Sequence, residues 1–377
     1  MSEEKIKILE MLENGKITAD DAVALLKQLK DDGGGRHDHY RPDWKQRIPH
    51  YHYRPDFGWI GDLRSAFEET ASTIGEAVRD AIGPNDVIFS ADRETFSTSA
   101  EMGGEILELS FEGKNAPVRL ESHWGDKIEV EAHYKAKSQW NPRFALNGDN
   151  GVYSLSYDEN ALYMLGIDIR VPETAKIGTI RLKNKNSSVT VNNIKAERIE
   201  ASTKNAFIKV SGCKGGFLLC ETKNAPVILD DIQTHEIEAQ TSNAKITLEN
   251  TDSNRVRLIT TCAKIEVQNS DIVKLTAKTS ESSLRFEGLG FKKEESVYSM
   301  DAITTNGRIA VMLPRSELCC KLRASAALGG VFCELSDLEY KINEEDYAEA
   351  QTRGYETARN KLNLNLQTTR HGIYIKQ

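Results

Sequence analysis

An internal repeat of 19 residues, which runs without a gap from Ile180, is the feature that most constrains the fold of this chain. Its six copies begin at Ile180, Ile199, Leu218, Ile237, Val256 and Leu275. Positions 1 and 3, and then positions 10 and 12, are apolar and are separated by polar residues. This alternation predicts two short strands per repeat. Because a short fixed period favours stacking of like on like, we expect a mainly β protein, a single-stranded parallel β-solenoid with 19-residue coils.

Two turns separate the strand segments of each repeat. Position 7, in the first turn, is Asn186, Asn205, Asn224 and Asn243 in four of the repeats. Asparagine accepts the left-handed backbone conformation, so we expect these residues to form the tight turns. Position 5 is threonine in five repeats, and we expect the hydroxyl groups to stack at the corner. These are Thr203, Thr222, Thr241, Thr260 and Thr279.

The β-solenoid is expected to cover residues 86–377. Residues 109–127 form another 19-residue copy, and residues 303–313 repeat the turn with Gly307 at its tight position. Residues 128–179 interrupt the repeat with strand-like sequence, which predicts an inserted antiparallel section.

The C-terminal part of the sequence predicts two further features. Residues 343–360 predict a side insertion that forms a short helix, with Asn343 as its N-cap. Residues 363–376 have the pattern of a coil and are predicted to close the solenoid.

Residues 1–31 have the sequence of a small α-helical hairpin. Asn14-Gly15 ends the first helix, since both residues tolerate positive φ. A hairpin of this size is too small to bury a core alone. It must therefore dock on the rest of the chain, on a second copy of itself or on another protein, and we expect a protein partner or self-association through its apolar stripes. The residues of these stripes are Ile6, Leu9, Leu12, Val23 and Leu26.

Residues 32–61 form a linker rich in His, aromatic residues and Pro, and residues 62–83 predict an amphipathic helix. The polar face of this helix is acidic, which favours packing on the solenoid end over a position on a membrane. The linker histidines are His37, His39, His50 and His52. They could hold a divalent metal ion, but their spacing matches no defined site, so a solvated linker is favoured and no cofactor is assigned. A contact of the linker with anionic lipid or an acidic partner is the alternative.

Charge and composition exclude several classes of protein. The net charge of −8 argues against nucleic-acid binding, which needs a concentrated basic face. No apolar run approaches the ~20 residues of a membrane span, and the first residues do not resemble a secretory signal. The six cysteines lack zinc-site spacing and are expected to be reduced. We expect a cytoplasmic protein, peripheral to a membrane if it contacts one, with the cell surface as the alternative.

The sequence contains no recognisable catalytic motif. Glycan-active enzymes with parallel β-helices need clustered carboxylates in one groove. Asp230-Asp231 is the only adjacent acidic pair in the six repeats, and its place in the second turn indicates a turn rather than a catalytic pair. We therefore expect no enzyme. Charged residues on one outward strand face are the candidates for contact instead, with a solvated face as the alternative. They are Lys209, Lys245, Lys264 and Arg285, with Glu266 among them.

Two parts of the chain resemble one family of bacterial proteins. The sequence EKIKILEMLENGKITADDAVALLKQL at 4–29 resembles the SHOCT-like N-terminal domain of YvlB and LiaX-type proteins of Gram-positive bacteria. The repeats, with their T-x-N-[AG]-x-[IV]-x-[VIL] pattern, resemble the candidate-adhesin β-solenoid of the same proteins. The resemblance covers roughly residues 1–30 and 105–377, and the order of the parts also matches. The family usually has Ser-Gly at the tight turn, where most coils here have Asn-Ala.

The resemblance implies a role in cell-envelope stress responses and brings no catalytic residues with it. The sequence therefore favours a non-enzymatic scaffold or sensor that acts through protein or envelope contacts. A surface adhesin that binds cell-wall glycan or peptide is the alternative. A glycan-active β-helix enzyme is the least favoured interpretation.

Overall fold

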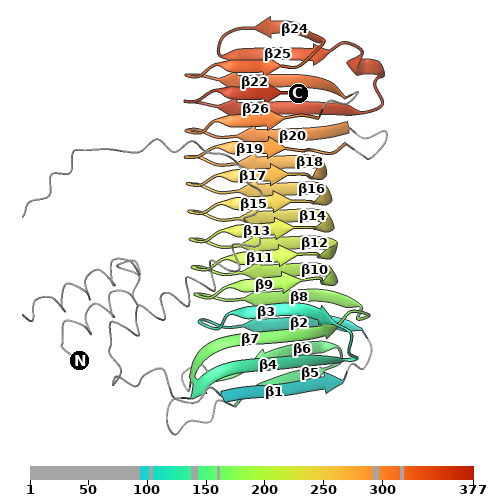
Figure 1. Ribbon diagram of the computed structural model, residues 1–377, viewed down its shortest axis with the longest axis vertical. Helices are drawn as coiled ribbons and strands as arrows, with labels where there is room; N and C mark the ends of the chain where they lie inside the picture. The colour runs from blue at the N-terminus through green and yellow to red at the C-terminus, as the bar shows by residue number, and fades with distance from the viewer. Residues whose placement is uncertain (1–93, 102–104, 137–142, 159–161, 292–296, 315–317) are drawn as a thin grey trace, which may run out of the picture. The chain divides into compact units, whose positions relative to one another are not determined.

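The computed structural model describes residues 94–101, 105–136, 143–158, 162–291, 297–314 and 318–377 (Figure 1). The chain divides into two units, Met1–Asp92 and Arg93–Gln377, and the description below concerns the second. The predicted hairpin, linker and amphipathic helix lie outside the described residues. So do the contact residues and histidines predicted there, which are Ile6, Leu9, Leu12, Val23, Leu26, His37, His39, His50 and His52.

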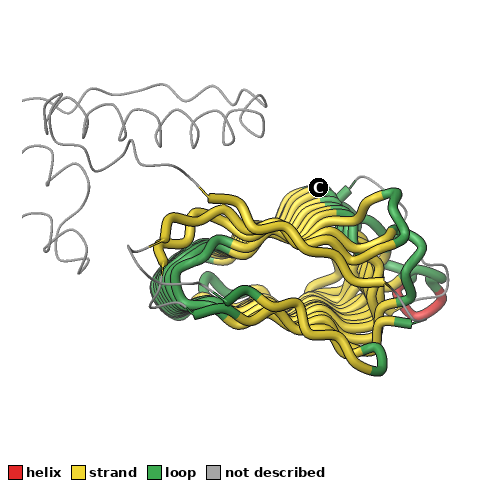
Figure 2. The backbone as a smooth tube through the Cα atoms, turned by 90° about the horizontal axis from the view of Figure 1, so that it is seen from below, coloured by secondary structure: helices red, strands yellow, loops and turns green. Residues whose placement is uncertain are grey.

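Two long sheets face each other along the second unit, as the end-on view shows (Figure 2). Sheet A has 13 strands and sheet B has 14. In sheet A the repeats form β9 (Val189–Asn192), β11 (Ile208–Ser211), β13 (Val227–Asp230), β15 (Ile246–Glu249), β17 (Ile265–Gln268), β19 (Leu284–Glu287) and β21 (Ile309–Met312). In sheet B they form β8 (Ile177–Lys183), β10 (Lys195–Ser202), β12 (Lys214–Glu221), β14 (Gln233–Gln240), β16 (Asp252–Ile259), β18 (Asp271–Lys278) and β20 (Val297–Ile303).

Neighbouring coils stack in parallel with a register of one repeat. Ile208 of β11, for example, lies between Val189 of β9 and Val227 of β13. The core between the sheets consists of columns of equivalent apolar residues, and the side chains of Val210, Leu229 and others are fully buried. Burial of each such side chain contributes about 1.5–3 kcal/mol. The predicted parallel β-solenoid is confirmed.

The tight turns do not lie where the sequence placed them. The left-handed residues are at position 14, in the second turn, and not at position 7. They are Asn193, Gly212, Asp231, Asn250, Asn269 and Gly288, with φ between 48° and 65°. The asparagines at position 7 form a ladder of side-chain hydrogen bonds instead. Asn186, Asn205 and Asn224 each donate through Nδ2 to the Oδ1 of the asparagine one coil before, at 2.8 Å. Stacking, rather than a need for positive φ, explains this column.

The threonines at position 5 are buried and do not hydrogen bond to one another. Each donates its hydroxyl to backbone carbonyls of the preceding coil, for example Thr279 Oγ1 to the carbonyl of Ala263 at 2.9 Å. Thr241 makes the same bond to Ala225 at 3.2 Å. The threonines are thus stacked at the corner, one per coil, and each hydroxyl bonds to carbonyl groups of the turn rather than to the next hydroxyl. These bonds connect consecutive coils at the corner.

Breaking the asparagine ladder in its middle is expected to cost stability. Replacing Asn224 with alanine removes its hydrogen bonds to Asn205 and Asn243. At about 1 kcal/mol per hydrogen bond, a loss of roughly 1–2 kcal/mol in the free energy of unfolding is expected. Chemical denaturation measures it. Gln240→Ala, at an exposed position of β14 in sheet B, serves as the control. Equal stability of the Asn224 variant and the wild type would contradict a structural role for the ladder.

The N-terminal end of the solenoid is capped by antiparallel strands. In sheet A, β4 (Lys127–Ala136) lies between β1 (Glu94–Glu101) and β7 (Leu162–Pro172) and runs antiparallel to both. In sheet B, β5 (Ala145–Asp149) is antiparallel to β6 (Val152–Ser156). Residues 128–179 thus contain the antiparallel section that the sequence indicated.

These capping strands continue the two sheets rather than leaving the solenoid. β7 pairs in parallel with β3 (Val118–His123), and β6 pairs in parallel with β2 (Ile106–Glu112). β2 and β3 then pair with β8 and β9, the first strands of the gapless repeat.

The C-terminal end differs from the predicted order. The segment predicted to close the solenoid forms β26 (Lys361–Thr368) and β27 (Ile373–Lys376). β26 lies between β20 and β22 (Cys319–Ala326), and β27 lies between β21 and β23 (Val331–Glu334). The last residues of the chain therefore form the penultimate coil, and the coil that precedes them in sequence is stacked outside it.

The prediction of a helix over residues 343–360 is also wrong. β24 (Leu338–Asn343) and β25 (Tyr347–Thr352) form an antiparallel pair that ends sheet B, and a single 3-10 turn, η2 (Tyr355–Thr357), follows. Ala348 and Ala350 are buried and alternate with partly exposed residues along β25. This burial of every second residue is typical of a strand and outweighs the helix propensity of the segment. The pair covers the open edge of β22.

Candidate functional site

A groove of about 380 Å³ lies on the outer face of sheet A near its C-terminal end. Strands β19, β21 and β27 form its floor, and their outward side chains line it. Four cations and one carboxylate are among its lining residues. These are Lys264, Arg285, Arg308, Lys376 and Glu287. The in-register stacking of the coils places these charges side by side.

Tyr374 and Met312 also line this groove, and Phe332 packs on Tyr374 beside it. The Tyr374 ring on β27 stacks on Phe332 with ring centroids 4.9 Å apart, and the guanidinium of Arg308 lies 4.8 Å from the Tyr374 centroid. Met312 is 47% exposed and Phe332 is 52% exposed. Exposed apolar groups beside cations favour a ligand that carries both negative charge and apolar surface.

Most cations of this face are paired with carboxylates. Arg285 contacts Glu287 at 2.8 Å, and Lys376 contacts Glu334 at 3.1 Å. Lys245 and Lys264 both pair with Glu266, which is only 12% exposed. Arg308 differs, because it forms no ion pair with a described residue and stacks on Tyr374 instead. Arg308 is therefore the cation of the groove that is most available to a ligand.

The two lysines control the ionisation of Glu266. Burial alone would raise its pKa, but hydrogen bonds and charges from Lys245 and Lys264 outweigh burial and hold the pKa below the ordinary value of 4.5. A carboxyl group with a depressed pKa stabilises the fold above that ordinary value. The stabilisation is then lost as the pH falls through the lower pKa of the folded state.

Glu266→Gln is therefore expected to lower the free energy of unfolding at pH 7 by about 1–2 kcal/mol. The difference from the wild type should shrink below pH 4.5 and vanish once Glu266 is protonated in both states. Denaturation at pH 7, 5 and 3 measures it. Glu287→Gln, which removes a more exposed pair, is the control and should cost less. A difference that is constant with pH would contradict this linkage.

The structure brings together only some of the predicted contact residues. All of Lys209, Lys245, Lys264 and Arg285 lie at the outer face of sheet A, but only Lys264 and Arg285 line the groove. Lys209, on β11, lies several coils away.

Sequence reasoning missed Arg308, Met312 and Tyr374. Arg308 precedes β21 by one residue, at the position that Lys245 and Lys264 hold before β15 and β17. That column equivalence was a usable signal for Arg308. Tyr374 joins the groove only through the insertion of β27 beside β21, which no local pattern indicated.

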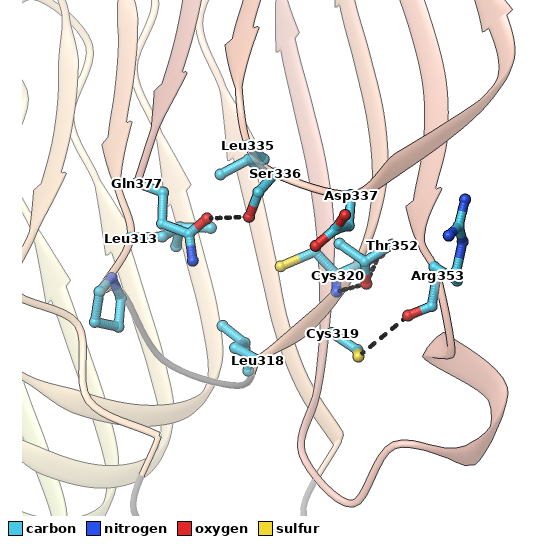
Figure 3. Close-up of a pocket in the computed structure, with 11 residues that line it drawn as sticks. Leu313, Leu318, Cys319, Cys320, Leu335, Ser336, Asp337, Thr352, Arg353 and Gln377 are labelled. Atoms are coloured by element: carbon cyan, nitrogen blue, oxygen red, sulfur yellow. Dashed lines mark hydrogen bonds between the residues drawn. The ribbon is translucent and has the colours of Figure 1, made fainter.

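A second, smaller pocket of about 190 Å³ lies where sheets A and B end near the C-terminus (Figure 3). Thr352 closes one side by accepting a hydrogen bond from the backbone N–H of Cys320 at 2.9 Å. Burial raises the pKa of the Cys320 thiol to about 12, so the thiol stays protonated at neutral pH. Ser336 donates a hydrogen bond to the Gln377 side chain at 3.1 Å. These contacts connect β22 to β25 and Ser336 to Gln377, which indicates a structural role for this pocket.

The acidic pair in the repeats has a structural role. Asp231 occupies the left-handed position of its turn with φ of 52°, and Asp230 accepts a hydrogen bond from Asn250 at 2.8 Å. The interpretation of Asp230-Asp231 as turn residues is confirmed. Among the residues that the structure describes, no group of three or more His, Cys, Asp or Glu is placed to hold a metal ion. No helix in the described part is long and apolar enough to cross a membrane.

Solved structures with a similar fold were found at low identity. A candidate adhesin from Parabacteroides merdae is 9% identical, covers 75% of this chain and 95% of its own, and has a TM-score of 0.44. A candidate lipid-binding protein from Parabacteroides distasonis is 11% identical over 76% and 98%, with a TM-score of 0.37. A candidate cell adhesion protein from Clostridium sporogenes is 11% identical over 76% and 100%, with a TM-score of 0.21. No curated protein sequence matches the chain.

Two family profiles match the sequence itself. The SHOCT-like domain matches residues 3–34, where the helical hairpin is expected. The Toastrack DUF4097 profile matches residues 106–366, which run from the first strand of the stacked coils to the inserted strand β26. Since this match spans most of the chain and nearly all of the described solenoid, the protein belongs to the Toastrack DUF4097 family.

Proposed function

We propose that this protein is a non-enzymatic scaffold whose groove on sheet A holds an acidic segment of a protein partner. The composition of the groove carries the proposal. Four cations surround the exposed Met312, and Arg308 has no carboxylate partner among the described residues. Carboxylates of the partner would pair with this cation, and an apolar side chain would cover Met312. No catalytic step, cofactor, metal ion or nucleic acid enters the proposal.

The resemblance to YvlB and LiaX-type proteins supports a role for this scaffold in the response to cell-envelope stress. We place the protein on the cytoplasmic side, in peripheral contact with the membrane. The SHOCT-like hairpin would supply a second contact, with a partner or with another copy of the chain. The rigid stack of coils would then hold the groove at a fixed position for its partner.

A surface adhesin that binds cell-wall glycan is the second candidate. One observation favours it: Lys185, Lys204 and Lys223 form an exposed column on one corner of the solenoid. This role would place the protein on the outer side of the membrane.

Site-specific cross-linking tests the groove. The full chain would carry a photoreactive amino acid in place of Met312, and irradiation of intact cells is expected to give an adduct with one discrete protein. The same amino acid in place of Thr190 is the control, since β9 carries it on the same face far from the groove. Adding Arg308→Glu to the Met312 variant should abolish the adduct through charge repulsion.

Three results would contradict the proposal. Equal adducts from both positions would indicate non-specific contact. An adduct that persists with Arg308→Glu would show that the cation does not select the partner. Lipid adducts alone, together with sedimentation of the chain on anionic vesicles, would replace the protein partner with a membrane surface.

A further inference from the structure

The first turn of the repeats carries an ordered column of lysines beside the asparagine ladder. Lys185, Lys204 and Lys223 hold position 6 of three consecutive coils, and all three are exposed. The backbone N–H of Lys204 donates to the carbonyl of Lys185 at 3.0 Å, and that of Lys223 donates to Lys204 at 3.3 Å. These bonds fix the register, so the lysines repeat about every 4.8 Å along the solenoid. We call this column and Asn186, Asn205 and Asn224 beside it the Lys-Asn corner.

The charges of this corner are not neutralised in the described part of the protein. Lys185, Lys204 and Lys223 form no ion pair there, and neither do Glu112 and Glu221, which end β2 and β12 two residues before this turn. Like charges stacked in register repel one another. A column of three ammonium groups is therefore a cost to the fold that this surface does not offset.

Several cations elsewhere on the solenoid are paired with carboxylates. On sheet B, Arg181 pairs with Glu108 and Glu200, and Arg255 pairs with Glu236 at 3.3 Å. On sheet A, Glu266 forms ion pairs with both Lys245 and Lys264. Exposed lysines without an ion pair in the described part also occur on sheet B, where Lys195 and Lys214 lie in register. The Lys-Asn corner differs from them because three successive coils each carry such a lysine next to the hydrogen-bonded asparagine ladder.

The asparagine ladder supplies rigidity and further hydrogen-bonding groups. Each carboxamide in the ladder uses one N–H and one oxygen lone pair for its neighbours at 2.8 Å. A carboxamide has two N–H donors and two acceptor lone pairs, so one of each remains on these exposed side chains. Each of the three coils of the Lys-Asn corner thus presents one ammonium group, one free N–H donor and one free acceptor lone pair of a carboxamide.

We infer that the Lys-Asn corner binds a linear acidic glycan with one carboxylate per sugar residue. The length of one sugar residue in an extended chain is close to the spacing of the coils, so successive carboxylates can meet successive lysines. Sugar hydroxyl groups match the free donor and acceptor of each asparagine. A nucleic acid fits less well, because sequence-tolerant binding of single strands uses exposed aromatic rings. The corner has none among the described residues, and Phe207 beside it is only partly exposed.

Binding of polygalacturonate to the full chain tests this inference, which does not depend on the groove. The wild type is expected to bind the polymer, with an affinity that falls as salt increases. The variant with Lys185, Lys204 and Lys223 all changed to Gln should bind roughly tenfold more weakly, the loss expected for three exposed ion contacts. The matched control changes Lys195, Lys214 and Lys274 to Gln. It removes the same charge from sheet B and should leave the affinity unchanged.

Two further probes separate the outcomes. Neutral dextran should not bind, and the groove variant Arg308→Glu should bind polygalacturonate as the wild type does. Absence of polygalacturonate binding, or equal losses in both lysine variants, would overturn the inference. Tighter binding of single-stranded DNA than of polygalacturonate, with the same dependence on the corner lysines, would assign the corner to nucleic acid and overturn it as well.

Discussion

Replacing Gly307 with alanine is expected to destabilise the solenoid by about 3 kcal/mol or more, the upper end of the cost of overpacking. A Cβ atom on Gly307 would lie 1.7 Å from the carbonyl oxygen of Ser282 and 2.2 Å from its carbonyl carbon. Both atoms belong to the backbone of the neighbouring coil, so no side-chain rotation relieves the contact. The two coils must separate at this corner, which weakens the hydrogen bonds between β19 and β21.

Gly166→Ala is the matched control for this prediction. A Cβ atom at Gly166 would meet nothing within 4 Å, so the substitution should be neutral or slightly stabilising. Thermal and chemical unfolding of the two variants and the wild type measure the effect. A Gly307 variant as stable as the Gly166 variant would mean that the coils are packed less tightly here than the structure indicates.

Deleting residues 361–377 is expected to unfold the C-terminal end selectively. The deletion removes β26 and β27 from the middle of their sheets, and with them the buried side chains Leu364 and Ile373. β22 and β23 lose their parallel partners, while β20 and β21 become open edges. Coils farther away should keep their structure, because each coil of a solenoid contacts only its neighbours.

Hydrogen exchange measured by mass spectrometry separates these regions. Residues 318–360 should lose protection by orders of magnitude, while residues 177–287 should exchange as in the full chain. Leu364→Asp provides a second route to the same result, because it buries a charge in the inserted coil without shortening the chain. Full protection of residues 318–360 after the deletion would contradict the account, since that coil would then have stacked directly on β20 and β21.

The repeat made the centre of the fold predictable, because positions 1, 3, 10 and 12 must all face one core. The roles of Asn205 and Asn224 were misjudged because a turn asparagine fits two explanations, positive φ and side-chain stacking. Only the contacts with the neighbouring coil decide between them.

The order of the last coils could not be predicted for a related reason. Every coil presents the same row of backbone donors and acceptors. The sequence pattern of β26 is therefore compatible both with insertion between two coils and with stacking at the end of the solenoid.

The candidate groove was predictable only in part. Lys264 and Arg285 stood out because outward positions follow from the strand alternation. Tyr374 comes from a segment that is far from Lys264 and Arg285 in sequence, and only the insertion of β27 brings it beside β21, with Phe332 of β23 on its other side. The pairing of Lys245 and Lys264 with one carboxylate was visible in the sequence as Glu266 two residues beyond Lys264. Its depressed pKa required knowledge of its burial.

We propose that the groove around Arg308 and Met312, rather than a catalytic site, carries the function. Survival of cells that lack the protein, after challenge with an envelope-damaging agent, tests this proposal. We predict that the wild-type chain and a Lys183→Glu control restore survival, whereas Arg308→Glu and Met312→Asp, expressed at equal levels and equally stable, do not. Full restoration of survival by both groove variants would contradict the claim.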